Sequence, residues 1–410
     1  MRGRPVCRPL PNSYLEAETK RPMALNRIYL DWNATAPLSA QARAAMMDTL
    51  RLPGNPSSVH GEGRAARAAM DKARRQVAAL VGGEPAHVIF TSGATEAANH
   101  VLTSDFLMGR APLIVSHLYV SAIEHPAIRE GGRFEPGRLS EVPVTRDGVM
   151  DLPALEEILG LHDRSSGLPM VALMLVNNET GIVQPVAEVA RLVHAHGGLM
   201  VVDAVQAVGR IPVDINALDA DFLILSSHKI GGPKGAGALV SRGEALMPKP
   251  LIRGGGQEKG HRSGTENFHA IVGFGAAAEA GLDDLGQRSS AITTLRDQLE
   301  QGMRQAAPDV IIHGAEVGRV CNTSFFTLPG LKSETGQIAF DLEGIALSAG
   351  SACSSGKVGE SHVLTAMGHD PKLGALRISL GADTTSDDIA RALAAFAKIA
   401  ARRKPAGEAA

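Results

Sequence analysis

The feature that most constrains the fold is the alternation of short apolar runs with helical patterns through the first two-thirds of the chain. Apolar runs of this length, bounded by polar or turn residues, are typical of buried strands. Between them, residues 64–83 show a helical pattern in which Met70, Val77 and Leu80 share one face and Gly82 supplies a C-terminal stop. The alternation predicts an α/β fold in which helices cover both faces of a mainly parallel sheet. The expected strands are HVIFTS (87–92), LIVS (113–116), VALMLVNN (171–178), LMVVDA (199–204), FLILSSHK (222–229) and GALV (237–240).

Polar residues gather just beyond the carboxyl ends of these strands. In open α/β sheets, ligands bind at that edge. Stability alone gives no reason for several strands to deliver unlike polar groups to one edge, so the pattern predicts a binding site there. The residues are Thr91 to Thr95, Asn177 and Asn178, Asp203, and Ser226 to Lys229.

The pattern changes after about residue 275, and 410 residues are enough for two domains. A long helix is expected over 289–308, followed by strands in CNTSFFTL and ALRISLG. A last helix should begin at Ser386, where Asp387 and Asp388 favour the positive end of its dipole. We therefore expect a large domain over 39–275 and a smaller α+β domain made of 24–38 and 276–410. Residues 1–23 are expected to form a disordered extension.

Charge and composition exclude several functional classes. The net charge of −2 gives no long-range attraction to nucleic acid or an anionic membrane. No apolar run approaches the roughly 20 residues of a membrane helix, and the first 20 residues lack the apolar core of a secretion signal. Cys7, Cys321 and Cys353 are far apart and have no CxxC spacing, which argues against a zinc site or a disulfide framework and for a cytoplasmic setting.

The segment FTSGATEA (90–97) predicts an anion-binding turn. A strand leads into a Gly-containing turn and then a helix, so free backbone N–H groups and the positive end of the helix dipole would face a bound phosphate. The spacing is neither the Rossmann dinucleotide pattern nor a P-loop, because GGPKGAGAL lacks GK[ST]. Taken alone, such a turn is more often a simple helix cap than an anion site.

Lys229 and Asp203 suggest what else this edge could bind. A lysine in a desolvated site loses proton affinity and can form a Schiff base, although a lone lysine is usually a solvated surface charge. A carboxylate at a neighbouring strand end could hold a protonated pyridine nitrogen, although Asp203 could also be a turn former. A phosphate turn, a lysine and an aspartate on successive strands together point to pyridoxal phosphate.

At this point the sequence resembles the cysteine desulfurases, which are class V aminotransferase-like enzymes of pyridoxal-phosphate fold type I. The resemblance covers roughly residues 28 to 400 and implies a mainly parallel, seven-stranded type of sheet in the large domain. The motifs that carry it are YLDWNATAPL, GNPSSVHGEGRAAR, FTSGATEAAN, AIEHPAI, VNNETG, VDAVQAVG, SSHKIGGPKG, GGGQEKGHRSGTEN, SAGSACSS and LRISLG.

The resemblance implies roles for individual residues around the cofactor. Lys229 would bind pyridoxal phosphate as a Schiff base, Asp203 would pair with the pyridine nitrogen, and Gln206 would hydrogen-bond the phenolic oxygen. His125 would stack on the ring and assist proton transfer, and Asn178 would support the ring and the substrate. The residues implied to hold the phosphate are Ala94, Thr95, Ser226 and His228.

The resemblance also implies one residue that binds the substrate and one that contacts the cofactor of a partner subunit. Arg377 of LRISLG matches the arginine that binds the substrate carboxylate, a task that suits its planar fork of donors. Thr265 matches a threonine that reaches the phosphate of the partner subunit, which implies an obligate homodimer with shared active sites.

Cys353 lies in SAGSACSSGKVGES (348–361), a stretch of small residues that the cofactor chemistry does not explain. In the implied mechanism, Lys229 and His125 move protons while the Cys353 thiolate takes sulfur from L-cysteine, leaving a persulfide and L-alanine. Gly350 and Gly356 would keep movement of this loop easy, so that the sulfur could pass to an acceptor such as an iron–sulfur scaffold protein. The resemblance implies no intrinsic metal, although Cys353 is a candidate for a transient ligand of an iron–sulfur cluster. The long loop resembles that of the group I enzymes.

Three alternative functions remain open from the sequence, and the chain departs from the usual pattern of the family at two places. The alternatives are a selenocysteine lyase, another β-eliminating enzyme of the same fold, and a non-catalytic scaffold. Relatives usually carry Glu-Pro-Ser after the loop thiol, where this chain has Gly359, Glu360 and Ser361, and loss of the proline should loosen the loop. Trp32 stands where Tyr or Asn is more usual.

Overall fold

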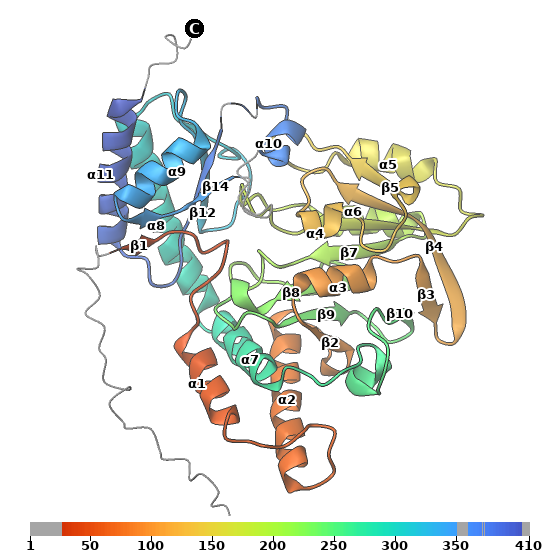
Figure 1. Cartoon of the computed structure of the whole chain (residues 1–410). Helices are drawn as coiled ribbons and strands as arrows, with labels where there is room; N and C mark the ends of the chain where they lie inside the picture. Colours follow the sequence, from red (N-terminus) through yellow and green to blue (C-terminus); the bar gives the residue numbers. More distant parts are fainter. Residues whose placement is uncertain (1–26, 351–359, 371, 373, 404–410) are drawn as a thin grey trace, which may run out of the picture.

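The computed structural model describes residues 27–350, 360–370, 372 and 374–403. Its main element is a nine-stranded sheet with the order β10-β3-β4-β6-β7-β8-β9-β2, and β5 pairs with β4 beside this path. Figure 1 shows the sheet surrounded by helices, as expected for the α/β class. The strands are β2 (Val88–Thr91), β3 (Asp105–Met108), β4 (Ala111–Ser121), β5 (Leu139–Val142), β6 (Leu168–Met174), β7 (Leu199–Asp203), β8 (Phe222–Ser226), β9 (Gly237–Ser241) and β10 (Leu246–Pro248).

Seven of these strands, in the order β5-β4-β6-β7-β8-β9-β2, form the expected type of sheet. Strands β5, β4, β6, β7 and β8 pair in parallel, whereas β9 and β2 are antiparallel to their neighbours. Two strands lie beyond the expected seven: β3 pairs antiparallel with β4, and β10 pairs antiparallel with β3. The 11-residue β4 is long enough to pair with β3 along its first part and with β5 along its last.

Helices cover both faces of the sheet because its central strands are apolar on both sides. Along β8, Leu223 and Leu225 face one core, which also contains residues of α2, α5, α6 and α7. Phe222 and Ile224 face the other core, which contains residues of α3 and α4. The helices are α2 (Gly61–Leu80), α3 (Ala94–Val101), α4 (Pro126–Arg129), α5 (Leu152–Gly160), α6 (Val186–Ala195) and α7 (Phe268–Leu282). Helix α1 (Ala40–Thr49) packs against α7.

A second hydrophobic core forms around a four-stranded antiparallel sheet with the order β11-β12-β15-β14. Strand β1 (Ile28–Tyr29) pairs in parallel with β13 (Ile345–Ala346), so Ile28 and Leu30 lie in this core. The predicted smaller domain, 24–38 plus 276–410, contains both β1 and β13. The exact domain boundaries stay a prediction. The other elements here are α8 (Leu285–Ala306), β11 (Ile311–Ile312), β12 (Thr323–Thr327), α9 (Ser333–Leu342), β14 (Ser348–Ala349), α10 (His362–Ala366), β15 (Leu376–Ser379) and α11 (Ser386–Arg402).

Helix ends follow the expected local rules. Helix α11 begins at Ser386, as predicted, and Thr385 and Asp388 form a capping box in which each side chain accepts from the other residue's backbone N–H. Gly82, the predicted stop after α2, has a φ of +60° that favours glycine. The described part of the chain also contains the short 3₁₀ segments η2 (Pro85–His87), η3 (Pro136–Arg138), η4 (Ser227–Lys229) and η5 (Gln257–Gly260).

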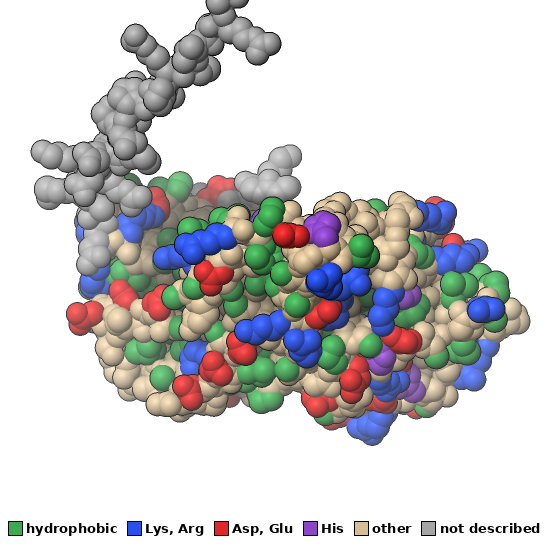
Figure 2. Space-filling view, turned by 90° about the horizontal axis from the view of Figure 1, so that it is seen from below, with side chains coloured by type: hydrophobic (Ala, Val, Ile, Leu, Met, Phe, Trp, Pro, Cys, Tyr) green, Lys and Arg blue, Asp and Glu red, His purple; other side chains and the backbone are tan. Residues whose placement is uncertain are grey.

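The described helices are all too short or too polar to cross a membrane. Figure 2 shows one face of the molecule, where basic and acidic side chains are intermixed. This mixture is unlike the continuous basic stripe that nucleic-acid-binding surfaces usually carry.

Candidate active site

A cavity of about 630 Å³ opens at the carboxyl edge of the parallel strands. Nine of the residues singled out from the sequence line this one cavity, although they come from five separate segments of the chain. They are Ala94, Thr95, His125, Asn178, Asp203, Gln206, Ser226, His228 and Lys229. The rule that ligands bind beyond the carboxyl ends of strands therefore located the cavity correctly.

The turn before α3 forms one wall. Ala94 and Thr95 are the first two residues of α3, so their N–H groups belong to the free donors at a helix start. The Glu96 side chain accepts a hydrogen bond from the Ser92 N–H at 2.8 Å and pairs with Arg262 at 2.9 Å. These contacts hold the turn in a shape suited to an anion.

Lys229 lies at the end of η4, directly after β8. Its Nζ atom donates to the carbonyl oxygens of Asn33 and Ala34, at 2.8 and 2.9 Å. The amine is therefore held by the segment that follows β1, and its side chain lines the cavity.

Asp203 closes β7 and lies beside the same cavity. Its Oδ1 atom accepts from the Val205 N–H at 2.9 Å. Burial raises the pKa of Asp203 to about 6, against the opposing effects of that hydrogen bond and of Lys229. A cation next to this carboxylate would offset the loss of hydration.

One side-chain atom of Gln206 lacks a hydrogen-bond partner among the described residues. Its Nε2 atom donates to the Asn33 carbonyl at 3.0 Å. Its Oε1 atom is buried and has no hydrogen-bond partner among the described residues. Buried polar atoms of folded proteins usually have a partner, so this atom points to a missing ligand group.

His125 caps α4 through its ring. Its Nδ1 atom accepts from the Ala127 N–H at 3.1 Å. Burial, Lys229 and His362 lower the pKa of His125 to about 4, so the ring is neutral near pH 7. Because Nδ1 acts as an acceptor, the single ring proton lies on Nε2.

Ser226 and His228 complete the wall next to Lys229. Ser226 is buried at the end of β8. The His228 ring contacts the Thr35 hydroxyl at 3.1 Å, and burial lowers its pKa to about 4, with further lowering by Lys229 and Lys234. A neutral ring near the α3 turn can donate a hydrogen bond to an anion without carrying a charge.

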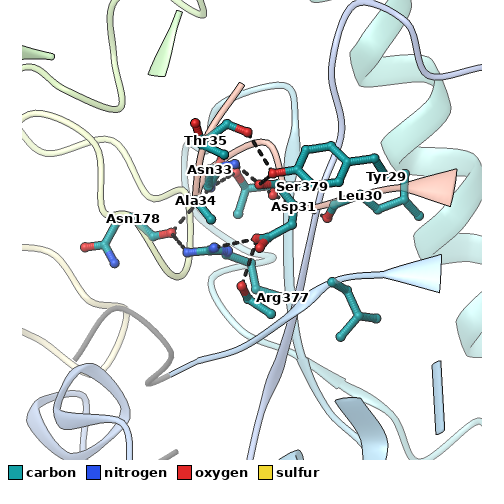
Figure 3. Close-up of polar contacts among 12 residues, drawn as sticks. Tyr29, Leu30, Asp31, Asn33, Ala34, Thr35, Asn178, Arg377 and Ser379 are labelled. Atoms are coloured by element: carbon teal, nitrogen blue, oxygen red, sulfur yellow. Dashed lines mark hydrogen bonds and ion pairs between the residues drawn. The ribbon is translucent and has the colours of Figure 1, made fainter. Parts of the chain in front are cut away.

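Arg377 does not line the cavity but lies directly behind it. Its side chain on β15 is 1% exposed, Nη1 donates to the Asn178 carbonyl at 2.8 Å, and Nη2 pairs with Asp31 at 2.9 Å. Figure 3 shows the guanidinium between these two partners, with Asn33 alongside. The Asp31 carboxylate also accepts from the Ser348 hydroxyl at 2.8 Å.

The remaining predicted residues fall elsewhere. Thr265 is exposed on the segment after η5 and does not line the cavity of its own chain. Cys353 lies outside the described residues, as do Cys7, Gly356 and Gly359. In the part of the chain that the structure describes, no group of three or more His, Cys, Asp or Glu side chains could hold a metal.

Two buried carboxyl groups near the site were missed from sequence. Glu124 precedes His125, accepts from the Met174 N–H at 2.7 Å, and has a pKa well above its ordinary value because of burial. Glu179 accepts from the Ser361 hydroxyl at 2.6 Å, and burial raises its pKa to about 7. Their positions in the AIEHPAI and VNNETG motifs were the available signal.

Comparison with known proteins identifies the family. A family model described as "Aminotransferase class-V" matches residues 28–392. The chain belongs to the aminotransferase class-V family. Within this family it is 40% identical over 377 residues to a "Cysteine desulfurase" of Cereibacter sphaeroides, covering 90% of this chain and 94% of the relative. A "Cysteine desulfurase" of Sinorhizobium fredii is 39% identical over 375 residues, covering 89% and 94%.

Comparison with solved structures agrees with this family assignment. The structure of a "NifS-like protein" from Rickettsia africae has a TM-score of 0.80 and 34% identity, covering 91% of this chain and 99% of that one. The resemblance to cysteine desulfurases, the fold class and the assignment as an enzyme are thereby confirmed.

Proposed function

We propose that this class-V family member is a cysteine desulfurase, which removes sulfur from L-cysteine to give L-alanine and a persulfide on Cys353. The observation that carries the proposal is the convergence of Lys229, Asp203 and His125 on one cavity, in a chain about 40% identical to curated cysteine desulfurases.

The cavity fits pyridoxal phosphate. It offers an amine at Lys229, a partly desolvated carboxylate at Asp203 that would gain from a cationic ring nitrogen, and an unmet polar atom at Gln206. The turn before α3 offers backbone donors for the phosphate, together with Thr95 and His228. Bound there, the cofactor would supply an electron sink for carbanion chemistry at the substrate.

The chain's own groups would perform the proton transfers. Lys229 would hold the cofactor and then act as a base once its amine is released. His125 is neutral near pH 7, so its ring can take up a proton as a general base and return it from the resulting imidazolium. Asp203 would keep the ring nitrogen protonated through its negative charge.

Arg377 would bind the substrate carboxylate. In the structure its guanidinium already contacts Asp31 and the Asn178 carbonyl, which fix the plane of the fork. Cys353 would act as the thiolate that attacks the substrate sulfur, a role that comes from its sequence context. The sulfur would then pass to an acceptor such as an iron–sulfur scaffold protein in the cytoplasm.

A homodimer with shared sites is part of the proposal. Thr265 is exposed and absent from the cavity of its own chain, which suits a residue that serves a partner's cofactor phosphate. A purified protein that behaved only as a monomer while fully active would contradict this part.

The test is to incubate the yellow, cofactor-loaded protein with L-cysteine and dithiothreitol. Sulfide and L-alanine should appear in equal amounts, and mass spectrometry after brief exposure without reductant should find one additional sulfur on Cys353. Cys353→Ser should keep the yellow colour and lose sulfide release. If that variant kept its activity on L-cysteine, a β-eliminating mechanism would replace the proposal, and absence of both products would favour a non-catalytic scaffold.

A further inference from the structure

A second cavity, of about 520 Å³, lies on the other side of the Lys229 turn. Its wall combines the start of α1, the segment 208–210, residues 229–231 and the segment 380–383 that follows β15. Its volume falls within the range of small-molecule sites. None of the roles assigned above uses this space.

Arg210 is the most unusual residue of this wall. It is 8% exposed, and no carboxylate of the described residues lies within ion-pair distance. Its only hydrogen-bond acceptor in the described part of the chain is the Gln206 carbonyl, 2.8 Å from Nη1. The guanidinium has five N–H groups and lines the cavity, so one acceptor leaves it with further donors for a bound ligand.

The neighbouring thiol does not neutralise this charge. Cys321 lines the same cavity and is 93% buried, and burial raises its pKa, so it is uncharged near pH 7. Burial lowers the pKa of Arg210 to about 10, which still leaves the guanidinium charged. A buried charge without a counter-ion is unfavourable, and a bound anion would relieve it.

Helix α1 directs its N-terminus at the same cavity. Ser39 caps the helix by accepting from the Ala42 N–H, and the next two residues, Ala40 and Gln41, line the cavity. Their N–H groups have no acceptor in the described part of the chain. A ten-residue helix adds a positive dipole end to the charge of Arg210.

The other charged groups around the cavity leave it positive. Arg43, one turn into α1, is exposed and forms no ion pair with any residue that the structure describes. Arg288 donates to backbone carbonyls at the end of α7. Lys229 bonds the carbonyls of Asn33 and Ala34. Asp383 is the single carboxylate in the wall, and it lies on the exposed segment after β15.

We propose that this second cavity binds a tetrahedral oxyanion, phosphate or sulfate, through the Arg210 guanidinium and the N-terminal N–H groups of α1. The anion could be inorganic or a group of a small metabolite, and the cavity is large enough for the latter. Because Gly231 follows the Lys229 turn and Gly381 follows the strand of Arg377, an occupant would contact both elements that position the active site. The proposal does not depend on the proposed desulfurase reaction.

The test is calorimetric titration of the full-length protein, saturated with pyridoxal phosphate so that the α3 turn is occupied. Inorganic sulfate, inorganic phosphate and glycerol 3-phosphate are titrated separately at constant ionic strength. One site per chain is expected. Tighter binding of glycerol 3-phosphate would identify an organic phosphate as the ligand type, and equal binding of all three would identify the free anion.

Three variants test whether the anion binds in this second cavity. Arg210→Met should weaken binding at least tenfold, because hydrogen bonds to a charged group are among the stronger ones. Arg43→Gln, at an exposed position that should not affect folding, should weaken it several-fold. Thr95→Val, on the wall of the other cavity, should leave the affinity unchanged.

The result that overturns the proposal is an absence of binding by all three anions, or binding that Thr95→Val abolishes and Arg210→Met does not. If Arg210→Met fails to fold, the comparison between Arg43→Gln and Thr95→Val decides between the two cavities.

Discussion

The Nη2 atom of Arg377 lies 2.9 Å from the Oδ1 atom of Asp31, which joins the strand proposed to bind substrate to the segment that follows β1. The same segment supplies the carbonyls of Asn33 and Ala34 that hold Lys229. A short stretch near the start of the described chain therefore contacts two of the principal groups of the proposed active site.

This contact predicts a stability effect. Asp31→Ala should lower the free energy of unfolding by about 2–3 kcal/mol, because it removes the carboxylate that pairs with the buried Arg377. The loss should be smaller than for a fully buried pair because Asp31 is partly exposed. The matched control is Asp341→Ala, which removes the exposed pair with Arg27 and should change stability by less than about 1 kcal/mol. Urea unfolding monitored by circular dichroism measures both, and equal effects would contradict the prediction.

His194 should make stability depend on pH. Burial lowers its pKa, but hydrogen bonds to Asp221 and Asp219 at 2.9 Å more than compensate, so its net pKa is raised. A raised folded-state pKa contributes stability that is complete below the unfolded value of about 6.5 and is lost as the pH rises through the folded value.

The measurement compares the wild type with His194→Gln in urea at pH 5.5 and 8.5. The stability difference between the two proteins should be larger at pH 5.5. His196→Gln, whose ring contacts only the Leu192 carbonyl in the described structure, is the control and should show no such trend. A difference that grew with rising pH would have the wrong sign.

Asp203→Asn should separate cofactor binding from catalysis. The variant keeps the size of the side chain but cannot balance a cationic ring nitrogen, so kcat on L-cysteine should fall on the order of 100-fold while the yellow colour persists. Absorbance spectra and alanine formation provide the two readouts. An unchanged kcat would remove Asp203 from its proposed role.

His125→Gln should lower kcat by roughly 100-fold or more, as expected for the loss of a general acid–base group. Because the pKa of His125 is about 4, titration of this ring should not shape the rate between pH 6 and 8. The pH profiles of the wild type and the variant should therefore run in parallel over that range. A bell-shaped limb near pH 6.5 that disappeared in the variant would contradict a neutral His125.

Much of the fold and most of the cavity could be predicted from sequence, because both follow from local patterns. Runs such as FLIL mark buried strands, and polar residues placed just after them must meet at one sheet edge, which is why Asp203 and Lys229 share a cavity. Helix α11 was placed correctly because capping chemistry is local.

Features that depend on distant partners could not be predicted in the same way. The pairing of Asp31 with Arg377 arises from packing between segments near opposite ends of the chain. The absence of a carboxylate partner for Arg210 within the described structure is visible only when its surroundings are assembled. The position of Trp32 also depends on a distant partner. Its ring fills the space where a side chain at Gly381 would lie, since a Cβ there would be 1.9 Å from the indole.

The pairing of β1 with β13 also bears on how the protein is made. Ile28 and Leu30 leave the ribosome early, but Ile345 and Phe396, which share their core, are synthesised near the end. The first strand must therefore remain without its native partners through most of translation. The carbonyls that hold Lys229 belong to the segment directly after it, so the lysine site should be among the last parts of the molecule to mature.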